Sequence, residues 1–208
     1  MDHGGTPVTS ARELAGLVGA PTPAALRKVR TRLHGLDRQW LAASPLCFVA
    51  TADGDGHQDV SPKGDPAGLA HVLDDVTIAI PERPGNRRAD GFHNVLANPH
   101  VGLLFVIPGR GDTLRVNGTA RLLRGVPYAE ELRVRGHVPR LVLEVTVEEV
   151  FHHCSKAFLR SRTWDPDAWT PDAMPRRAVL ARTLERPEDS LDVLDAHYGP
   201  RYAEHLYG

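Results

Sequence analysis

The chain has 208 residues, 41% hydrophobic content and a formal net charge of −1, which suits one domain with terminal extensions. The balanced charge excludes a global field that would attract nucleic acid or an anionic membrane, and no apolar run approaches the roughly 18 residues of a membrane span. Two isolated cysteines, Cys47 and Cys154, and an N-terminus without a signal-peptide pattern predict a cytoplasmic protein with no disulfide framework.

Two helices are predicted before residue 45. Ser10 caps a helix that runs to Val18, with Glu13 at the spacing of a capping box. Thr22-Pro23 opens a second helix with a cap and a first-turn proline. Its apolar stripe recurs at helical period, at Leu26, Val29, Leu33 and Leu36. The basic side chains at 27–32 lie mostly off this stripe, and we interpret them as a solvated face rather than a nucleic-acid patch.

Six strands are expected from position 46 onward, with mostly short turns between them. Their ranges are 46–52, 57–63, 76–80, 101–107, 113–123 and 141–150. Asp53-Gly54-Asp55-Gly56 has the chemistry of a hairpin turn between the first two strands. The same string matches part of a calcium loop but lacks its final Glu, so no metal is expected there. Closely spaced, alternating strands favour an antiparallel barrel over βαβ units.

One helix, from about Arg87 to Ala97, is expected to interrupt these strands, with Asn86 as its N-cap and Asn98-Pro99 as its end. Further helical segments are expected near 128–134, just after 151 and at 191–197. The chain is thus predicted to divide into three parts. These are an N-terminal helical extension at 1–44, a barrel domain at 45–164 and an arm at 165–208 that packs on the barrel or on a dimer partner.

The first candidate site places Arg83, Asn86, Arg87 and Arg88 around a Pro84-Gly85 turn. Arginines in the first turn of a helix oppose the helix dipole, whose positive end lies there. A bound anion would remove this conflict, because free backbone N–H groups and guanidinium groups both bind phosphate oxygens. The pattern predicts a phosphate clamp, and its alternative is a solvated basic helix start.

A second candidate lies in the strand at 57–63. A proline within a strand removes a ladder donor, so Pro62 predicts that the strand ends or bulges there. Ser61 and Lys63 are two residues apart and therefore share one face. A hydroxyl and an ammonium on one face suit phosphate or the polar atoms of a ring, and the alternative is an ordinary exposed strand end.

The third candidate is the polar face of the strand at 113–123, with Thr113, Arg115 and Asn117 on one side. Alternation places apolar residues on the opposite side of this strand. The polar face is either open to solvent or covered by a ligand or a partner subunit.

The fourth candidate follows the last strand. Lys156 and Arg160 are four residues apart on one helix face, where like charges repel unless an anion bridges them. Trp164 can pack over a flat ring. Adjacent ligands at 152–154 do not make a tetrahedral zinc site, and Cys154 has no identifiable base, so neither a metal nor a nucleophile is predicted. Hydrolase, P-loop and dinucleotide fingerprints are absent. The clusters together predict binding of a planar molecule that carries a phosphate.

Five motifs carry a resemblance to a known family between about Pro45 and Trp164. They are SPKGD (61–65), RPGNRRAD (83–90), NVLANPHVGLLF (94–105), TLRVNG (113–118) and HCSKAFLRS (153–161). In this order they resemble a bacterial branch of the pyridoxamine 5′-phosphate oxidase-like, FMN-binding split-barrel family. The resemblance implies a mainly β fold, a six-stranded antiparallel split β-barrel with flanking helices. It also implies a homodimer with two FMN sites at the subunit interface.

The resemblance further implies roles for the four candidate clusters. Lys63 and the turn at 83–88 would hold the FMN phosphate, and Ser61 would lie near the phosphate or the ribityl chain. Thr113 and Arg115 would border the flavin of the partner subunit, and the segment at 156–164 would complete the site. The expected FMN-binding set is Ser61, Lys63, Arg83, Asn86, Arg87, Arg88, Asn94, Thr113, Arg115, Lys156, Arg160 and Trp164.

The implied activity is that of an FMN-dependent oxidoreductase acting on a small molecule, with NAD(P)H as a candidate electron donor. No side chain is assigned as a catalytic acid or base, because the flavin ring carries the redox chemistry. The C-terminal segment with which the authentic oxidase binds substrate phosphate has no match here, so pyridoxamine phosphate is not the expected substrate. The alternatives are a flavin carrier or sensor without turnover, and a split barrel that holds haem or a deazaflavin. Nucleic-acid and membrane partners are not expected.

Overall fold

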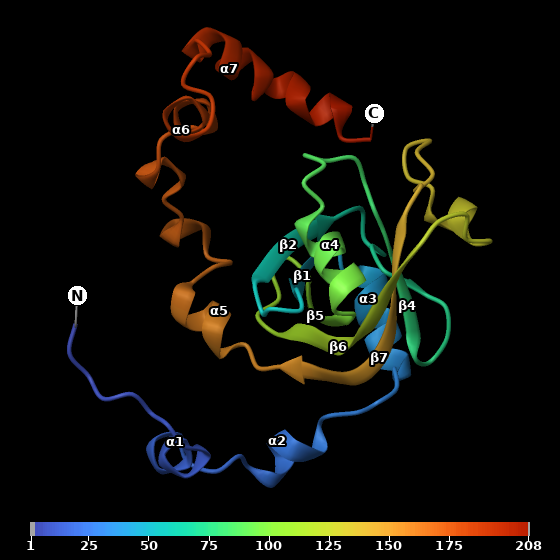
Figure 1. Cartoon of the computed structure of the whole chain (residues 1–208), viewed down its shortest axis with the longest axis vertical. Helices are drawn as coiled ribbons and strands as arrows, with labels where there is room; N and C mark the ends of the chain where they lie inside the picture. The colour runs from blue at the N-terminus through green and yellow to red at the C-terminus, as the bar shows by residue number, and fades with distance from the viewer. Residues whose placement is uncertain (1–2, 208) are drawn as a thin grey trace.

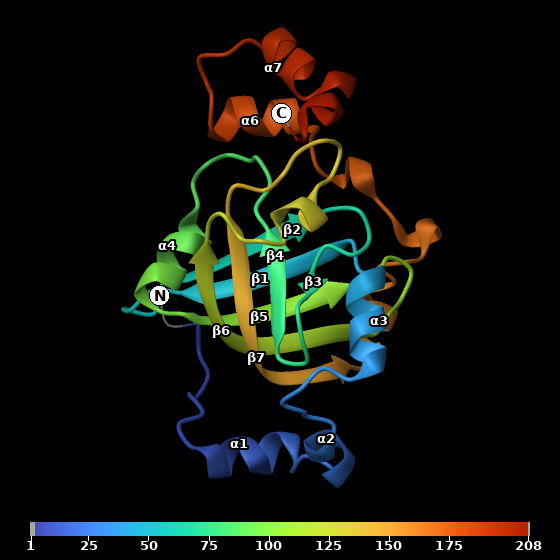
Figure 2. The same ribbon diagram turned by 90° about the vertical axis from the view of Figure 1, so that its right-hand side faces the viewer.

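The structure is a computed structural model that describes residues 3–207. Its centre is an antiparallel sheet with the strand order β2-β1-β5-β6-β7-β4-β3. The strands are β1 (Leu46–Ala52), β2 (Gln58–Gly64), β3 (His71–Val72), β4 (Thr77–Pro81), β5 (His100–Val106), β6 (Thr113–Leu123) and β7 (Val142–His153). Figure 2 shows β1, β2 and β5 running across β4, so the sheet curls over its own core. The mainly β, antiparallel split-barrel fold with flanking helices is therefore confirmed.

Helices precede the strands of this sheet, interrupt them once and follow them. They are α1 (Ala11–Val18), α2 (Pro23–Arg27), α3 (Gly35–Ala43), α4 (Asp90–Ala97), α5 (Lys156–Ser161), α6 (Arg177–Leu184) and α7 (Leu191–His197). Four 3-10 turns accompany them, namely η1 (Ala129–Leu132), η2 (Pro166–Ala168), η3 (Pro171–Ala173) and η4 (Pro200–His205). Figure 1 shows α3 and α4 against the sheet, whereas α1, α2 and the segment from α5 to α7 form two arms around it. No helix in the described part of the chain is long and apolar enough to cross a membrane.

The core lies between the curled halves of the sheet. Strand alternation directs apolar side chains inward, and Ile78, Leu103 and Phe105 are almost completely buried. Trp40 and Leu41 of α3 belong to the same cluster. All six expected strands are present, and β3 adds a two-residue seventh strand that pairs with β4.

The helix predicted from Thr22 stops much earlier than its apolar pattern indicated. Thr22 is the N-cap, as expected, but α2 ends at Arg27. The reason is tertiary, because Arg30 exchanges backbone hydrogen bonds with Val150 of β7 at 3.1 and 2.7 Å. The chain is therefore extended at this point, and a separate helix, α3, begins after a capping box formed by His34 and Asp37.

The expectation that Pro62 ends or bulges the second strand is also wrong. Pro62 pairs in register with Phe48, and β2 continues to Gly64. Because β2 is the edge of the sheet, its outward side has no ladder bond that a missing N–H would break.

The C-terminal arm contains one helix more than predicted. The expected helix at 191–197 is α7, and α6 precedes it. Ala178 and Ala181 of α6 pack with Leu194 of α7 in a small cluster of their own. Two alanines give a weak apolar signal, which explains why the sequence pattern did not indicate α6. The division of the chain at residues 45 and 165 stays a prediction.

Candidate functional site

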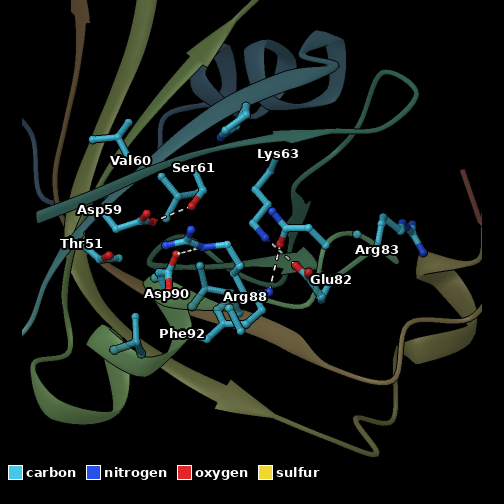
Figure 3. A pocket seen from close by; sticks show the side chains of 18 of the residues that line it. Thr51, Asp59, Val60, Ser61, Lys63, Glu82, Arg83, Arg88, Asp90 and Phe92 are labelled. Atoms are coloured by element: carbon cyan, nitrogen blue, oxygen red, sulfur yellow. Dashed lines mark hydrogen bonds and ion pairs between the residues drawn. The ribbon is translucent and has the colours of Figure 1, made fainter. Parts of the chain in front are cut away.

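A cavity of about 450 Å³ lies between β2, the loop that follows β4 and the first turn of α4. Figure 3 shows Asp59, Ser61 and Lys63 of β2 facing Arg88, Asp90 and Phe92 across it. Residues from β2 and from the loop–helix segment supply most of its walls, and apolar side chains such as Val49, Leu69 and Leu143 complete them. The volume falls within the range of about 300 to 1,000 Å³ that is typical of small-molecule sites.

Strand β2 presents three polar side chains to this cavity. Asp59, Ser61 and Lys63 share a face because side chains alternate along a strand, and this brings Ser61 and Lys63 together as predicted. The Ser61 hydroxyl donates to Asp59 Oδ2 at 2.6 Å. Lys63 Nζ donates to Glu82 Oε2 at 2.6 Å and lies 4.6 Å from the centre of the Phe92 ring. Lys63 is thus anchored by an acid and by an aromatic face.

The loop of arginines is not part of helix α4, contrary to the sequence prediction. Arg87 has φ 63° and Ala89 has φ 56°, both in the left-handed region that no helical residue adopts. The helix therefore begins at Asp90 with Ala89 as its N-cap, and Asn86 instead accepts a hydrogen bond from the Arg88 backbone at 3.0 Å. These arginines therefore precede the helix and do not occupy its first turn.

The arginines of the loop differ in how far carboxylates already satisfy them. Arg83 is only partly exposed and binds Asp65 at 2.6 Å and the Leu132 carbonyl at 2.7 Å. Arg88 donates to Asp90 at 2.8 Å, and this hydrogen bond raises the pKa of the exposed guanidinium above its usual value. Arg87 has no ion pair and no side-chain hydrogen bond with any residue that the structure describes. Arg87 is thus the cation most available to a bound anion.

The floor of the cavity is tightly packed around Gly91. A Cβ at Gly91 would lie 3.0 Å from Asp59 Oδ2 and 3.4 Å from Thr51 Oγ1. Asn94, one of the expected FMN-binding residues, is not among the lining residues and donates to Thr51 Oγ1 at 3.1 Å. Asn94 therefore supports the wall of the cavity and does not line it.

The expected site residues on β6 lie outside this cavity. Thr113, which is expected on the polar face of β6, is only 3% exposed within its own chain. The chain after β7 returns against the turn before β6, so that a Cβ at Gly111 would lie 2.8 Å from the Cβ of Ser155. Arg115 is exposed, donates to Asn117 at 3.1 Å and lies over the Phe151 ring.

The residues expected to complete the site from the C-terminal side also lie elsewhere. Lys156 and Arg160 are exposed on α5, outside the cavity lining. Trp164 donates to the Arg110 carbonyl at 2.7 Å and stacks on Phe158 with a ring separation of 5.7 Å. Six of the expected residues therefore line this cavity within one chain, and the other expected residues do not. The six are Ser61, Lys63, Arg83, Asn86, Arg87 and Arg88.

Sequence reasoning missed the acids of the site. Asp59, Glu82 and Asp90 line the cavity, and each contacts a polar or basic neighbour there. The strand alternation that joins Ser61 to Lys63 also reaches Asp59 and could have indicated it. No sequence pattern indicated Glu82, because its partner Lys63 lies on β2, far from it along the chain.

A model of the pyridoxamine 5′-phosphate oxidase family matches residues 35–154, more than half of the chain. A comparison with curated proteins gave no match. HupZ of Group A Streptococcus is similar in structure, with 25% identity, 58% of this chain and 94% of that chain covered, and a TM-score of 0.47. An FMN-binding protein of Syntrophomonas wolfei gives 11% identity, 56% and 83% coverage, and a TM-score of 0.45.

A third similar structure is an FAD-binding protein of Mesorhizobium loti, with 20% identity, 60% and 96% coverage, and a TM-score of 0.40. The family assignment itself depends on the family model. That match runs from α3 to the end of β7 and so includes every strand of the sheet and the cavity between β2 and α4. The chain belongs to the pyridoxamine 5′-phosphate oxidase-like family.

Proposed function

We propose that the chain is an FMN-dependent oxidoreductase whose cavity between β2 and α4 holds the phosphate end of FMN. The observation that carries the proposal is Arg87, a cation at this cavity without a protein partner among the described residues. The cavity is lined by four cations, Lys63, Arg83, Arg87 and Arg88, against three carboxylates. A phosphate group would supply the missing negative charge and would accept hydrogen bonds from the guanidinium groups.

The lining also suits the remainder of FMN. Val49, Leu69 and Leu143 give the cavity an apolar wall, and the Phe92 ring lies beside Lys63. Apolar walls with a few placed polar groups are the usual composition of cofactor sites.

When bound, FMN supplies a ring that accepts and donates hydride or electrons. The residues of this chain bind and orient it. Lys63 and Arg87 neutralise the phosphate, and the exposed Arg88 can turn from Asp90 to the same group. The Ser61 hydroxyl donates its hydrogen bond to Asp59, so its oxygen is left to accept a hydrogen bond from the ribityl chain.

The proposal includes a homodimer. Arg115, Lys156 and Arg160 are exposed on their own chain and lie outside the cavity, so a second copy could contact them at its own cavity. The substrate is proposed to be a small molecule other than pyridoxamine phosphate, with NAD(P)H as the candidate electron donor.

The test is FMN binding by the purified 208-residue chain and two variants. We expect a visible flavin band that survives gel filtration. Arg87→Ala should weaken FMN binding about tenfold to a hundredfold, because a hydrogen bond to a charged group contributes about 1.5 to 3 kcal/mol. Arg12→Ala is the matched control, since Arg12 is an exposed arginine of α1 outside the cavity.

Flavin fluorescence quenching gives the affinities, and analytical ultracentrifugation gives the oligomeric state. NAD(P)H consumption by the loaded protein distinguishes an enzyme from a carrier. Protein that retains no FMN, or a haem spectrum in place of a flavin band, would contradict the cofactor assignment. Equal affinity in Arg87→Ala and Arg12→Ala would contradict the phosphate clamp.

A further inference from the structure

A second cavity, of about 510 Å³, lies between the Pro84-Gly85 turn and the C-terminal end of the chain. Figure 1 and Figure 2 both show the red C-terminal segment beside the green loop that carries this turn. The loop contributes Arg87 to the lining, and α7 and η4 contribute His197, Arg201 and Tyr202. Arg87 also lines the first cavity, so the two cavities adjoin at its side chain.

The charges in this second cavity all have one sign. Arg87 and Arg201 line it, and neither has an ion pair or a side-chain hydrogen bond with a described residue. Among the described residues that line the cavity, none is an acid. The first cavity differs, because its cations face three carboxylates. Two guanidinium groups without a counter-ion in one cavity favour an anionic ligand.

The remaining lining is apolar and aromatic. Tyr202 and His197 meet edge to face, with ring centres 5.7 Å apart, and Leu206 and Pro84 lie at the same cavity. An aromatic wall beside guanidinium groups suits a ligand with a flat, apolar body and an acidic group. A small inorganic anion would leave these apolar walls without a contact.

The C-terminal segment is held in place beside the loop by its end. Tyr207 donates a hydrogen bond to Asp65 at 2.5 Å, and its ring receives the guanidinium groups of Arg83 and Arg135, each at 5.7 Å. Asp65 also binds Arg83 directly. These contacts fix the segment that carries Arg201 and Tyr202 against the loop that carries Arg87.

We propose that this second cavity binds a planar organic anion whose acidic group is held between Arg87 and Arg201. The site is distinct from the FMN site proposed above and does not depend on it. Arg87 contributes to both sites, Arg201 only to this one and Lys63 only to the first. The two sites can therefore be separated by three single substitutions.

The probe is 8-anilino-1-naphthalenesulfonate, a fluorescent aromatic anion, titrated into the 208-residue chain. We expect Arg201→Ala to weaken its binding about tenfold, in line with the loss of one charge-assisted contact. Arg182→Ala is the matched control, since Arg182 is an exposed arginine of α6 that lines neither cavity. The uncharged analogue N-phenyl-1-naphthylamine should bind wild type and Arg201→Ala equally, which separates the anionic contact from general apolar binding.

A second comparison distinguishes this proposal from the flavin proposal. Lys63→Gln should weaken the binding of FMN and leave the binding of the sulfonate unchanged, whereas Arg87→Ala should weaken the binding of both ligands. Binding of the sulfonate that depends on Arg201, in protein that takes up no FMN, would support this site and contradict the flavin function. Equal sulfonate affinity in Arg201→Ala and Arg182→Ala, with circular dichroism unchanged, would overturn the proposal. Sulfonate binding that Lys63→Gln weakens as much as Arg87→Ala does would also overturn it, because the sulfonate would then occupy the flavin site.

Discussion

Tyr207 donates its phenolic hydrogen to Oδ1 of Asp65 at 2.5 Å, across 142 positions of the chain. The other carboxylate oxygen of Asp65 binds Arg83, the first arginine of the loop at the candidate site. Burial, and then the hydrogen bond to Asp65, raise the pKa of Tyr207, because both favour the protonated phenol. The end of the C-terminal arm and the arginine loop are therefore fixed by one buried carboxylate.

Tyr207→Phe should loosen the C-terminal arm. The substitution removes one hydrogen bond but keeps the ring between Arg83 and Arg135, so we expect a loss of about 1 kcal/mol. Limited proteolysis should show faster cleavage after residue 165, and chemical denaturation should show the lower stability. Tyr202→Phe is the control, because the structure shows no hydrogen bond from that hydroxyl to a described residue. Unchanged cleavage in Tyr207→Phe would show that the hydroxyl does not fix the arm.

Glu82→Gln should increase FMN affinity severalfold. Glu82 holds Lys63 at 2.6 Å and competes with a phosphate for the same ammonium group. Both side chains are partly exposed, so loss of the pair should change stability by less than about 1 kcal/mol. Fluorescence titration with FMN measures the effect, and Glu188→Gln, an exposed acid outside the cavity, is the control. Weaker FMN binding in Glu82→Gln would mean that Glu82 positions Lys63 for the ligand.

Gly118→Ala should be severely destabilising. A Cβ at Gly118 would lie 1.9 Å from the Thr146 carbonyl oxygen, at the irregularity where the β6–β7 register shifts. Backbone atoms cannot move aside as a flexible side chain can, so we expect a loss of more than about 3 kcal/mol. Guanidinium denaturation measures it. Gly54→Ala, in the hairpin turn with no atom within 4 Å of the new Cβ, should change stability little. Similar stabilities of the two variants would refute this account.

The two thiols should react at very different rates. Burial raises the pKa of Cys47 to about 12, whereas a backbone hydrogen bond from Lys156 lowers the pKa of the exposed Cys154. At mildly alkaline pH, Ellman's reagent should label one thiol quickly and the second only after unfolding, because the thiolate is the reactive form. Cys154→Ser should remove the fast phase. A fast phase that persists in that variant would show that Cys47 becomes accessible in the folded protein.

Local sequence patterns were sufficient to predict the ranges of most of the strands. The ranges 46–52 and 113–123 match β1 and β6 at both ends, and the hairpin turn after β1 forms as its Asp-Gly residues indicate. Ser10 and Thr22 cap α1 and α2 through their side chains. These features depend on alternation, turn chemistry and capping, which neighbouring residues decide together.

Other elements were decided by distant contacts. The pairing of Arg30 with Val150 ends α2 early, although the apolar period continued past it. The left-handed backbone at Arg87 and Ala89 moves the start of α4 to Asp90, and nothing in the side-chain pattern indicated this. Such positions depend on where the rest of the chain passes.

The sequence by itself determined that basic residues gather near a turn and that Ser61 and Lys63 share a strand face. Only the tertiary structure decided which cations are already neutralised. Asp65 arrives beside Arg83 and Glu82 beside Lys63, each from a different strand or loop, while no described carboxylate pairs with Arg87. The physical reason is that ion pairs form over a few ångströms in space, and the separation of two residues along the chain does not determine that distance.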